Sequence, residues 1–222
     1  KLLVYGSLYR EYIESAKSFG VDFNHYNFDS GVLLNNIRKE VDRLNTLHIQ
    51  FLRKAGVELI EGWAKFKSSN SILVNGSDSL YKEREIKANK ILIAVGGYPK
   101  RPNIKGSSLG WVSDDMFELK RFPENILIVG AGFIACEFAS ILNGLGTKVN
   151  QIVRGDNLLR GFDVEITNTL REEMESRGVE FKFGDYPIEI KKNKNYLKII
   201  TESGGSFDFE GLLFAIGRSP FI

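Results

Sequence analysis

The residues best suited to chemistry form a glycine-rich turn at positions 130–135 (GAGFIA), which matches the pattern G-x-G-x-x-A. The turn follows an apolar segment at 126–129 and opens a segment with helical periodicity. That is the place of a dinucleotide-binding turn in a strand–helix–strand unit. We expect Gly130 to make the tight turn, Gly132 to admit a pyrophosphate near the backbone, and Ala135 to let the helix pack closely on the strand. The helix N-terminus would then face the phosphates.

The end of the next strand indicates which dinucleotide binds. An NAD-specific site places an acid about 20 residues after the turn, where it accepts hydrogen bonds from the ribose 2′-hydroxyl. Here the strand at 149–153 is followed by Arg154, with no acid at the strand end. Arg154 is suited to a forked contact with the 2′-phosphate of NADPH. Arg160 lies six residues further along and is placed to return from the loop to the same phosphate. The sequence therefore favours NADPH.

The elements around this turn follow from hydrophobic periodicity. Residues 122–183 alternate as strand, helix, strand, helix, strand, which predicts a parallel sheet covered by helices. We expect the second of these helices to begin at Asp163 and to carry Ile166, Leu170 and Met174 on its apolar side.

The flanking regions are also patterned. Residues 1–60 are predicted to be mostly helical, with Ser30 capping a long helix that stops near Gly56. We expect strands at 57–60 and 71–74, and a strand buried on both faces at 91–97 (ILIAVGG). A final apolar strand is predicted at 212–217.

Composition excludes several classes of protein. The formal net charge is only +2 and no basic stripe runs along the chain, so nucleic acid is not an expected partner. No apolar run approaches the ~18 residues of a membrane span, and residues 1–20 lack the core of a signal peptide. The single cysteine excludes an internal disulfide and is typical of a reducing compartment. We therefore expect a cytoplasmic location, and we assign no metal ligands.

Longer motifs give the sequence a family resemblance. The turn continues as GAGFIACEFA over 130–139, and VRGDNLLRGFD follows over 153–163. Residues 93–97 (IAVGG) are similar to a strand end that the family writes A-T-G-G, and residues 215–220 (AIGRSP) are similar to its A-x-G-R-x-P motif. The chain resembles, essentially from end to end, the glutathione reductases of cyanobacterial and plant type within the pyridine nucleotide-disulfide oxidoreductase family.

This resemblance implies an enzyme that moves electrons from NADPH to FAD, then to a redox dithiol, and finally to glutathione disulfide. It implies an α/β fold in which a Rossmann-like NADPH-binding domain is inserted in a partial FAD-binding domain of three-layer ββα/α type. The implied boundaries are 1–98 for the partial FAD-binding domain, 99–215 for the NADPH-binding domain, and 216–222 for the return into the FAD-binding domain. The intact protein would be a homodimer.

The resemblance also assigns roles to individual residues. Glu137 matches a catalytic glutamate near the nicotinamide and flavin. His48 lies where relatives place a residue near the glutathione site, and a solvent-facing histidine is equally open. The family usually has tyrosine at position 133, where its ring covers the flavin, so Phe133 keeps the ring without the hydroxyl. The expected cofactor-binding residues are Gly96, Gly130, Gly132, Phe133, Ile134, Ala135, Glu137, Arg154, Arg160, Gly217 and Arg218.

The family's redox pair, C-x-x-x-x-C, is not found in these residues, and Cys136 is expected to be a packed small hydrophobe. The chain starts at Lys1 without methionine and stops at Ile222 just past a strand pattern, so we expect both ends to be cuts through a longer chain. We expect this chain to bind NADPH without reducing glutathione disulfide by itself. Reductases of the trypanothione, dihydrolipoamide or mercuric type, and a non-catalytic NADPH-binding module, are the alternatives.

Overall fold

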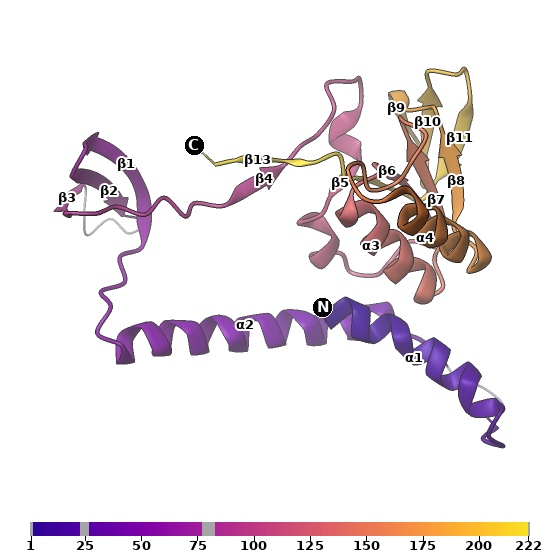
Figure 1. Ribbon diagram of the computed structural model, residues 1–222, viewed down its shortest axis with the longest axis horizontal. Helices are drawn as coiled ribbons and strands as arrows, with labels where there is room; N and C mark the ends of the chain where they lie inside the picture. Colours follow the sequence, from indigo (N-terminus) through magenta and orange to yellow (C-terminus); the bar gives the residue numbers. More distant parts are fainter. Residues whose placement is uncertain (1, 23–26, 77–82, 222) are drawn as a thin grey trace. The chain divides into compact units, whose positions relative to one another are not determined.

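The computed structural model describes residues 2–22, 27–76 and 83–221. The chain divides into two compact units, one formed by the residues up to Arg38 together with Gly97–Phe221, and one formed by Lys39–Gly96. The helices are α1 (Leu2–Lys17), α2 (Ser30–Lys54), α3 (Phe133–Gly144) and α4 (Val164–Ser176), with short 3₁₀ turns at Ser107–Leu109 and Asp115–Phe117 (Figure 1). The strands are β1 (Gly62–Ser68), β2 (Ser71–Gly76), β3 (Arg84–Lys87), β4 (Gly97–Pro99), β5 (Trp111–Val112), β6 (Asn125–Val129), β7 (Lys148–Val153), β8 (Glu180–Phe183), β9 (Pro187–Asn193), β10 (Tyr196–Thr201), β11 (Ser206–Phe209), β12 (Gly211–Phe214) and β13 (Arg218–Pro220).

A five-stranded sheet organises the first unit, with the strand order β5-β12-β6-β7-β8. Each neighbouring pair is parallel, which confirms the predicted Rossmann-like α/β fold. Strands β7 and β8 lie on one side of β6, and β12 and β5 lie on the other. The direction of winding therefore reverses at β6, and the crevice beyond the carboxyl end of such a strand is where α/β sheets bind ligands.

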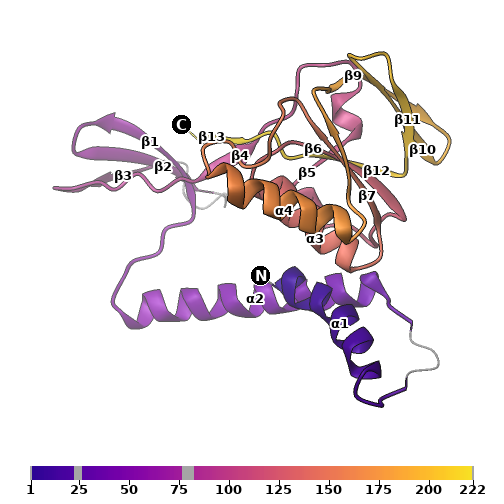
Figure 2. The ribbon, with the colours of Figure 1, turned by 45° about the vertical axis from the view of Figure 1, so that its right-hand side comes forward.

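The central strand β6 is buried on both faces because a different layer covers each one. Ile126 and Ile128 pack in a core formed with α3 and α4, whereas Leu127 and Val129 pack in a second core beneath the β9–β11 sheet. Figure 2 shows the two helices and the β9–β11 sheet on opposite sides of the parallel sheet. A strand covered on both sides reads as a continuous apolar run, and this is the pattern at 126–129.

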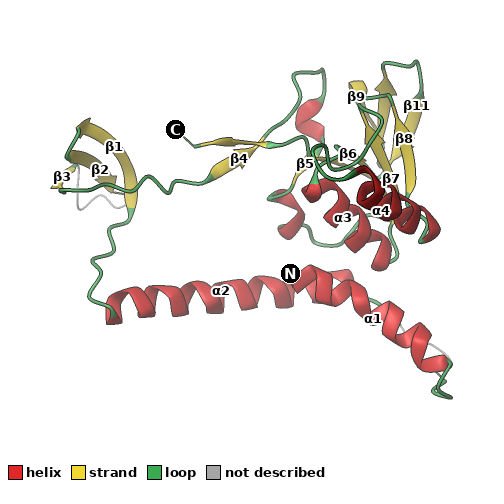
Figure 3. Ribbon diagram, viewed as in Figure 1, coloured by secondary structure: helices red, strands yellow, loops and turns green. Residues whose placement is uncertain are grey.

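The smaller sheets are antiparallel. β9, β10 and β11 form a three-stranded meander in the order β11-β10-β9, and β4 pairs with β13. In the second unit β1, β2 and β3 form another antiparallel sheet (Figure 3).

Helix starts follow local hydrogen bonding. Asp163 caps α4 as predicted, since its carboxylate accepts from the backbone N–H groups of Glu165 and Ile166. The predicted cap at Ser30 is wrong: the carboxylate of Asp29 accepts from the first N–H groups of α2. The Ser30 hydroxyl instead accepts from the backbone N–H of Phe122.

Three further sequence predictions are wrong. Residues 57–60 form no strand, and β1 begins only at Gly62. Residues 91–96 form no strand either, and Leu92 is 89% exposed, because no other strand of the described residues pairs with this run. Ile166 is 63% exposed, and Thr167 is the buried residue on the first turn of α4.

Within the described part of the chain, no helix has the length and apolar content needed to cross a membrane.

Candidate dinucleotide-binding site

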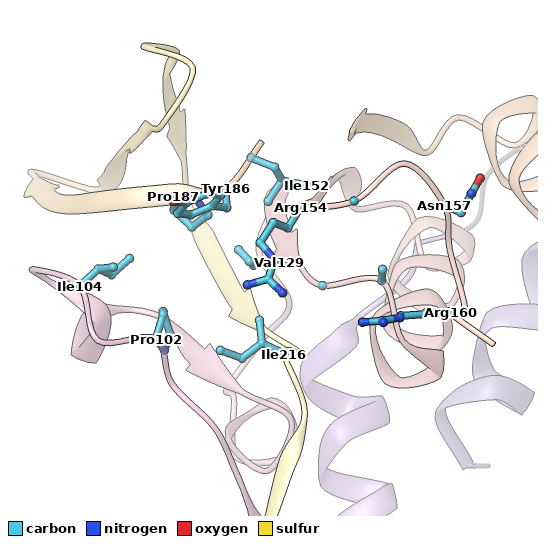
Figure 4. A pocket seen from close by; sticks show the side chains of 13 residues that line it. Pro102, Ile104, Val129, Ile152, Arg154, Asn157, Arg160, Tyr186, Pro187 and Ile216 are labelled. Carbon is cyan, nitrogen blue, oxygen red and sulfur yellow. The ribbon is translucent and has the colours of Figure 1, made fainter. Parts of the chain in front are cut away.

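A cavity of about 600 Å³ lies at the carboxyl ends of the parallel strands in the first unit. Val129 of β6, Ile152 of β7 and the segments that follow β7, β8 and β12 line it, as expected for a ligand crevice at the point where the winding reverses. Figure 4 shows the cavity from close by. Its lining residues are Pro102, Ile104, Val129, Gly130, Ala131, Ile152, Arg154, Gly155, Asn157, Arg160, Tyr186, Pro187 and Ile216.

The glycine turn after β6 is fixed between its neighbouring strands. The N–H of Gly130 donates to the carbonyl of Ile152 at 3.1 Å, and the N–H of Ala215 donates to the carbonyl of Val129 at 2.8 Å. Gly130 has a φ of +141°, and a Cβ there would lie 2.3 Å from the carbonyl oxygen of Ala215. Only glycine fits this turn without strain.

Two features of the turn suit an anionic ligand. A Cβ at Gly132 would meet no heavy atom within 4 Å, so the space beside its backbone is open. Gly132 is also the N-cap of α3, with no side chain bonded to the first N–H groups of the helix. Free N–H groups at a helix N-terminus form a natural binding site for phosphate. Ala135 is fully buried against the sheet, and Phe133 and Ile134 begin the helix.

A buried amide lies under the turn. The side-chain Nε2 of Gln151, on β7, donates to the carbonyl of Gly130 at 2.9 Å and to Sγ of Cys136 at 3.9 Å. Burial raises the pKa of the Cys136 thiol, although the hydrogen bond from Gln151 opposes this. Cys136 is therefore a packed, protonated thiol with low nucleophilicity.

The two predicted arginines both line the cavity. Arg154 directly follows β7 and Arg160 lies in the loop before α4; both side chains are exposed, and they extend towards the cavity in Figure 4. Among residues 2–22, 27–76 and 83–221, no carboxylate forms an ion pair with either guanidinium. The site thus carries two cations that no protein carboxylate pairs with among the described residues, next to the turn that leads into the open N-terminus of α3. This donor set fits a ligand with several phosphates.

Four further lining residues were not predicted from the sequence. Tyr186 and Pro187 follow β8, and Pro102 and Ile104 come from the segment before β5. Pro187 begins β9 and the other three belong to loops, and none of the four is part of a sequence motif. The available signal was the position of residues 184–187 just after the third strand of the predicted parallel unit, where ligand-contacting residues gather.

A second, smaller cavity of about 220 Å³ is lined by the second half of the turn and by residues 215–217. Phe133 is 63% exposed and lines it together with Gly132 and Gly217. Glu137 is exposed on α3 and outside the lining of both cavities. Arg218, on β13, donates to the carboxylate of Asp114 at 3.1 Å and to the carbonyl of Gly97.

Two predicted residues belong to the other part of the chain. Gly96, with a φ of +71°, and His48, exposed on α2, both fall in the Lys39–Gly96 unit. The structure therefore brings together the turn, both arginines and Ile216 of the C-terminal motif, whereas Gly96 and His48 are not joined to that site within one unit.

Comparison with known families agrees with this geometry. The family model for pyridine nucleotide-disulphide oxidoreductases matches residues 2–222. The chain belongs to this family.

Curated relatives include glutathione reductases from three sources. The chain is 42% identical over 222 residues to that of Nostoc sp., 38% identical to the chloroplastic/mitochondrial enzyme of Pisum sativum, and 33% identical to that of Burkholderia cepacia. Each match covers 99% of this chain and 39–47% of the relative. The chain thus spans less than half the length of these relatives.

Solved structures agree on the fold. The Cu(II) complex of the HOCl-induced flavoprotein disulfide reductase RclA from Escherichia coli superposes with a TM-score of 0.83 at 23% identity, covering 100% of this chain and 46% of that one. A second RclA structure gives a TM-score of 0.78 at 24% identity, over 87% of this chain and 44% of that one.

Proposed function

We propose that this chain supplies the NADPH-binding part of a flavoprotein disulfide reductase that reduces glutathione disulfide. The observation that carries the proposal is the pair Arg154 and Arg160, which line one cavity and form no ion pair with any carboxylate of the described residues. The turn residues Gly130 and Ala131 line this cavity, and the open N-cap of α3, Gly132, follows them directly and lines the neighbouring smaller cavity. Two arginines and a helix N-terminus together suit a ligand with a pyrophosphate and one additional phosphate.

The additional phosphate distinguishes NADPH from NADH. NADH has a free 2′-hydroxyl, which an acid at the end of the second strand would recognise. Here that position is Arg154, directly after β7. A guanidinium gains little from a hydroxyl but makes two parallel charge-assisted hydrogen bonds to a phosphate. The preference for NADPH therefore rests on residues of this chain.

The reaction beyond NADPH binding belongs to a longer protein of the same family. FAD, when bound, would relay electrons from the nicotinamide to a dithiol that reduces glutathione disulfide. In this proposal Glu137, Phe133, Gly217, Arg218 and Gly96 face the nicotinamide and flavin, and His48 lies near glutathione disulfide. Three similar curated proteins, from Nostoc sp., Burkholderia cepacia and Pisum sativum, are glutathione reductases, and this supports the choice of substrate.

The same proposal covers the organisation of the longer protein. Residues 1–98 and 216–222 would belong to the FAD-binding domain and residues 99–215 to the NADPH-binding domain. The protein would be a homodimer in a reducing compartment such as the cytoplasm. The single cysteine of the 222 residues is the buried Cys136, so the dithiol must come from outside these residues.

The test is a calorimetric titration of the 222-residue chain with NADPH and with NADH. Wild type should bind NADPH more tightly. An Arg154→Ala, Arg160→Ala double variant should lose about 100-fold or more in NADPH affinity, because hydrogen bonds to charged groups contribute about 1.5–3 kcal/mol each. Its affinity for NADH should change by less than about threefold, since NADH carries no 2′-phosphate.

The matched control removes two arginines elsewhere. Arg43→Ala with Arg53→Ala lowers the net charge equally, and both side chains are exposed on α2. This control should bind NADPH like wild type. Equal affinity of wild type for the two nucleotides would refute the proposal that Arg154 and Arg160 bind the 2′-phosphate. Reduction of glutathione disulfide by the isolated chain would refute the assignment of the dithiol to other residues.

A further inference from the structure

Tyr186 is the one aromatic residue among those that line the larger cavity. It follows β8 after two residues and is half-buried, and the buried Pro187 comes next. Pro102 and Ile104 extend the same apolar wall. Figure 4 shows Tyr186 and Pro187 together beside Ile152, at the side of the cavity from which Arg154 enters.

Glu202 holds Tyr186 by two hydrogen bonds, one at the hydroxyl of its ring and one at its backbone. Its hydroxyl donates to Oε1 of Glu202 at 2.8 Å, and its carbonyl accepts from the backbone N–H of Glu202 at 3.0 Å. The hydrogen bond to Glu202 raises the pKa of the phenol, so the hydroxyl remains a donor at neutral pH. A side chain fixed in this way loses little conformational freedom when a ligand binds against it.

The backbone below the ring is fixed by a buried carboxylate. Asp185 is 1% exposed and its Oδ1 accepts from the N–H of Tyr186 at 2.9 Å. The carboxylate of Asp185 also accepts from the backbone N–H of Ser203 at 3.1 Å and from the Ser203 hydroxyl at 2.6 Å. The ammonium group of Lys182 forms an ion pair with Asp185 at 2.9 Å. The wall is therefore tied to the β10–β11 connection and to β8.

The chemistry of the ligand places its base at this wall. The adenine and the 2′-phosphate of NADPH are attached to neighbouring atoms of one ribose. If the arginines bind the 2′-phosphate, the adenine must therefore lie close to them. Arg154 is close enough to Tyr186 to act on it electrostatically. Nucleobases stack on aromatic side chains, and this contact accepts any base because each has a π-face.

We propose that the ring of Tyr186 stacks on the adenine of the bound nucleotide, with Asp185 and Glu202 as positioning residues that hold the ring. This inference rests on the proposed NADPH-binding function and adds the residue that recognises the base. Glu202 lies outside the lining of the cavity, so its effect on binding passes through Tyr186.

The test uses adenosine 2′,5′-bisphosphate, which carries the base and the 2′-phosphate but no nicotinamide. Tyr186→Ala should weaken its binding to the 222-residue chain about tenfold or more, as for other bases stacked on aromatic rings. Tyr186→Phe keeps the ring and should weaken binding by less than about threefold. Tyr196→Ala is the matched control, because Tyr196 is exposed on β10 and does not line the cavity.

A proton NMR measurement reports the stacking directly. The H2 and H8 signals of bound adenine should shift upfield in wild type, shift upfield by less in Tyr186→Phe, which keeps the ring but lacks the hydrogen bond to Glu202, and lose that shift in Tyr186→Ala. Glu202→Ala should reduce the upfield shift without changing the thermal unfolding midpoint. Glu202→Gln should restore it, because its amide oxygen still accepts from the hydroxyl.

The outcomes separate this inference from the function on which it rests. If Tyr186→Ala binds the bisphosphate like wild type while the arginine double variant does not, the base lies elsewhere and the NADPH site stands. An upfield shift that survives in Tyr186→Ala would also reject the stacking. If wild type does not bind the bisphosphate at all, both proposals fail.

Discussion

Two apolar runs in this chain have nearly the same sequence and different environments. Residues 126–130 read ILIVG, and residues 91–97 read ILIAVGG. By pattern both are strands buried on two faces that end in a glycine turn. Only the first is one: Ile128 is 0% exposed, whereas Ile93 is 59% exposed.

The difference lies in the neighbours of each run. β6 is hydrogen-bonded to β7 on one side and to β12 on the other, and its faces are covered by two separate cores. Residues 91–96 pair with no strand in the part of the chain that the structure describes. An apolar pattern thus indicates that a segment is suited to burial in a sheet, but whether it is buried depends on the segments that pack and pair with it.

The largest expected effect tests this contrast by burying a charge. Ile128→Asp should destabilise the first unit by about 4 kcal/mol or more, because an uncompensated carboxylate would lie in the core. Ile93→Asp should change stability by less than about 0.5 kcal/mol, as surface substitutions do. Chemical unfolding of Ile128→Asp can be followed by Trp111 on β5 in a Trp63→Phe background, and that of Ile93→Asp by Trp63 on β1 in a Trp111→Phe background, because each tryptophan then reports the unit that carries the substitution. A large loss of stability in Ile93→Asp would show that residues 91–96 are buried in solution.

The glycines that end the two runs give a second contrast. Gly130→Ala combines a positive φ with a Cβ 2.3 Å from a backbone oxygen, so it should cost about 3 kcal/mol and prevent NADPH binding. In Gly96→Ala the added Cβ would have no heavy atom within 4 Å, so only the strain of a φ of +71° remains. This strain should cost about 1 kcal/mol of stability. The measurements are thermal unfolding and NADPH titration of each variant. Similar costs for both would mean that the turn after β6 relaxes around the added methyl group.

The predictable part of the molecule was the part whose signals are local. The strand–helix–strand order around residues 130–135 was correct because periodicity, the Asp163 cap and the glycine turn agree with each other. Both arginines of the predicted pair line one cavity, since both lie within one loop after β7, and their contact with a phosphate stays a prediction.

The unpredictable part depends on contacts between distant segments. Nothing local marks Tyr186, whose hydroxyl partner Glu202 lies 16 residues away. Nor does the sequence near Ser30 reveal that its hydroxyl binds the backbone of Phe122, 92 residues away, and leaves the helix cap to Asp29. The prediction of a buried strand at 91–97 was wrong for the same reason, because the neighbouring strands that such a strand needs are not encoded in its own residues.

The smallest expected effect compares one carboxylate from each unit. Burial alone would raise the pKa of Asp185, but hydrogen bonds from Ser203, Lys182 and Thr201 outweigh it and hold the pKa well below its usual range. The pKa of Glu85, on β3, is also lowered, by hydrogen bonds from Lys67 and Ser71, but its side chain is 35% exposed. The two residues therefore differ mainly in solvent screening.

Asp185→Asn should cost about 2 kcal/mol at pH 7, since it removes hydrogen bonds to a charged group. Because the folded-state pKa is depressed, the stabilisation is complete above the unfolded pKa of about 3.9 and is lost as the pH falls towards the folded value. The difference between wild type and Asp185→Asn should thus be constant from about pH 7 to pH 5 and shrink below about pH 4. Glu85→Gln should leave the acid unfolding midpoint unchanged, because exposed ion pairs contribute little. A stability difference for Asp185→Asn that stays constant down to pH 2 would mean that the carboxylate acts through packing, and that its charge does not fasten the wall of the cavity.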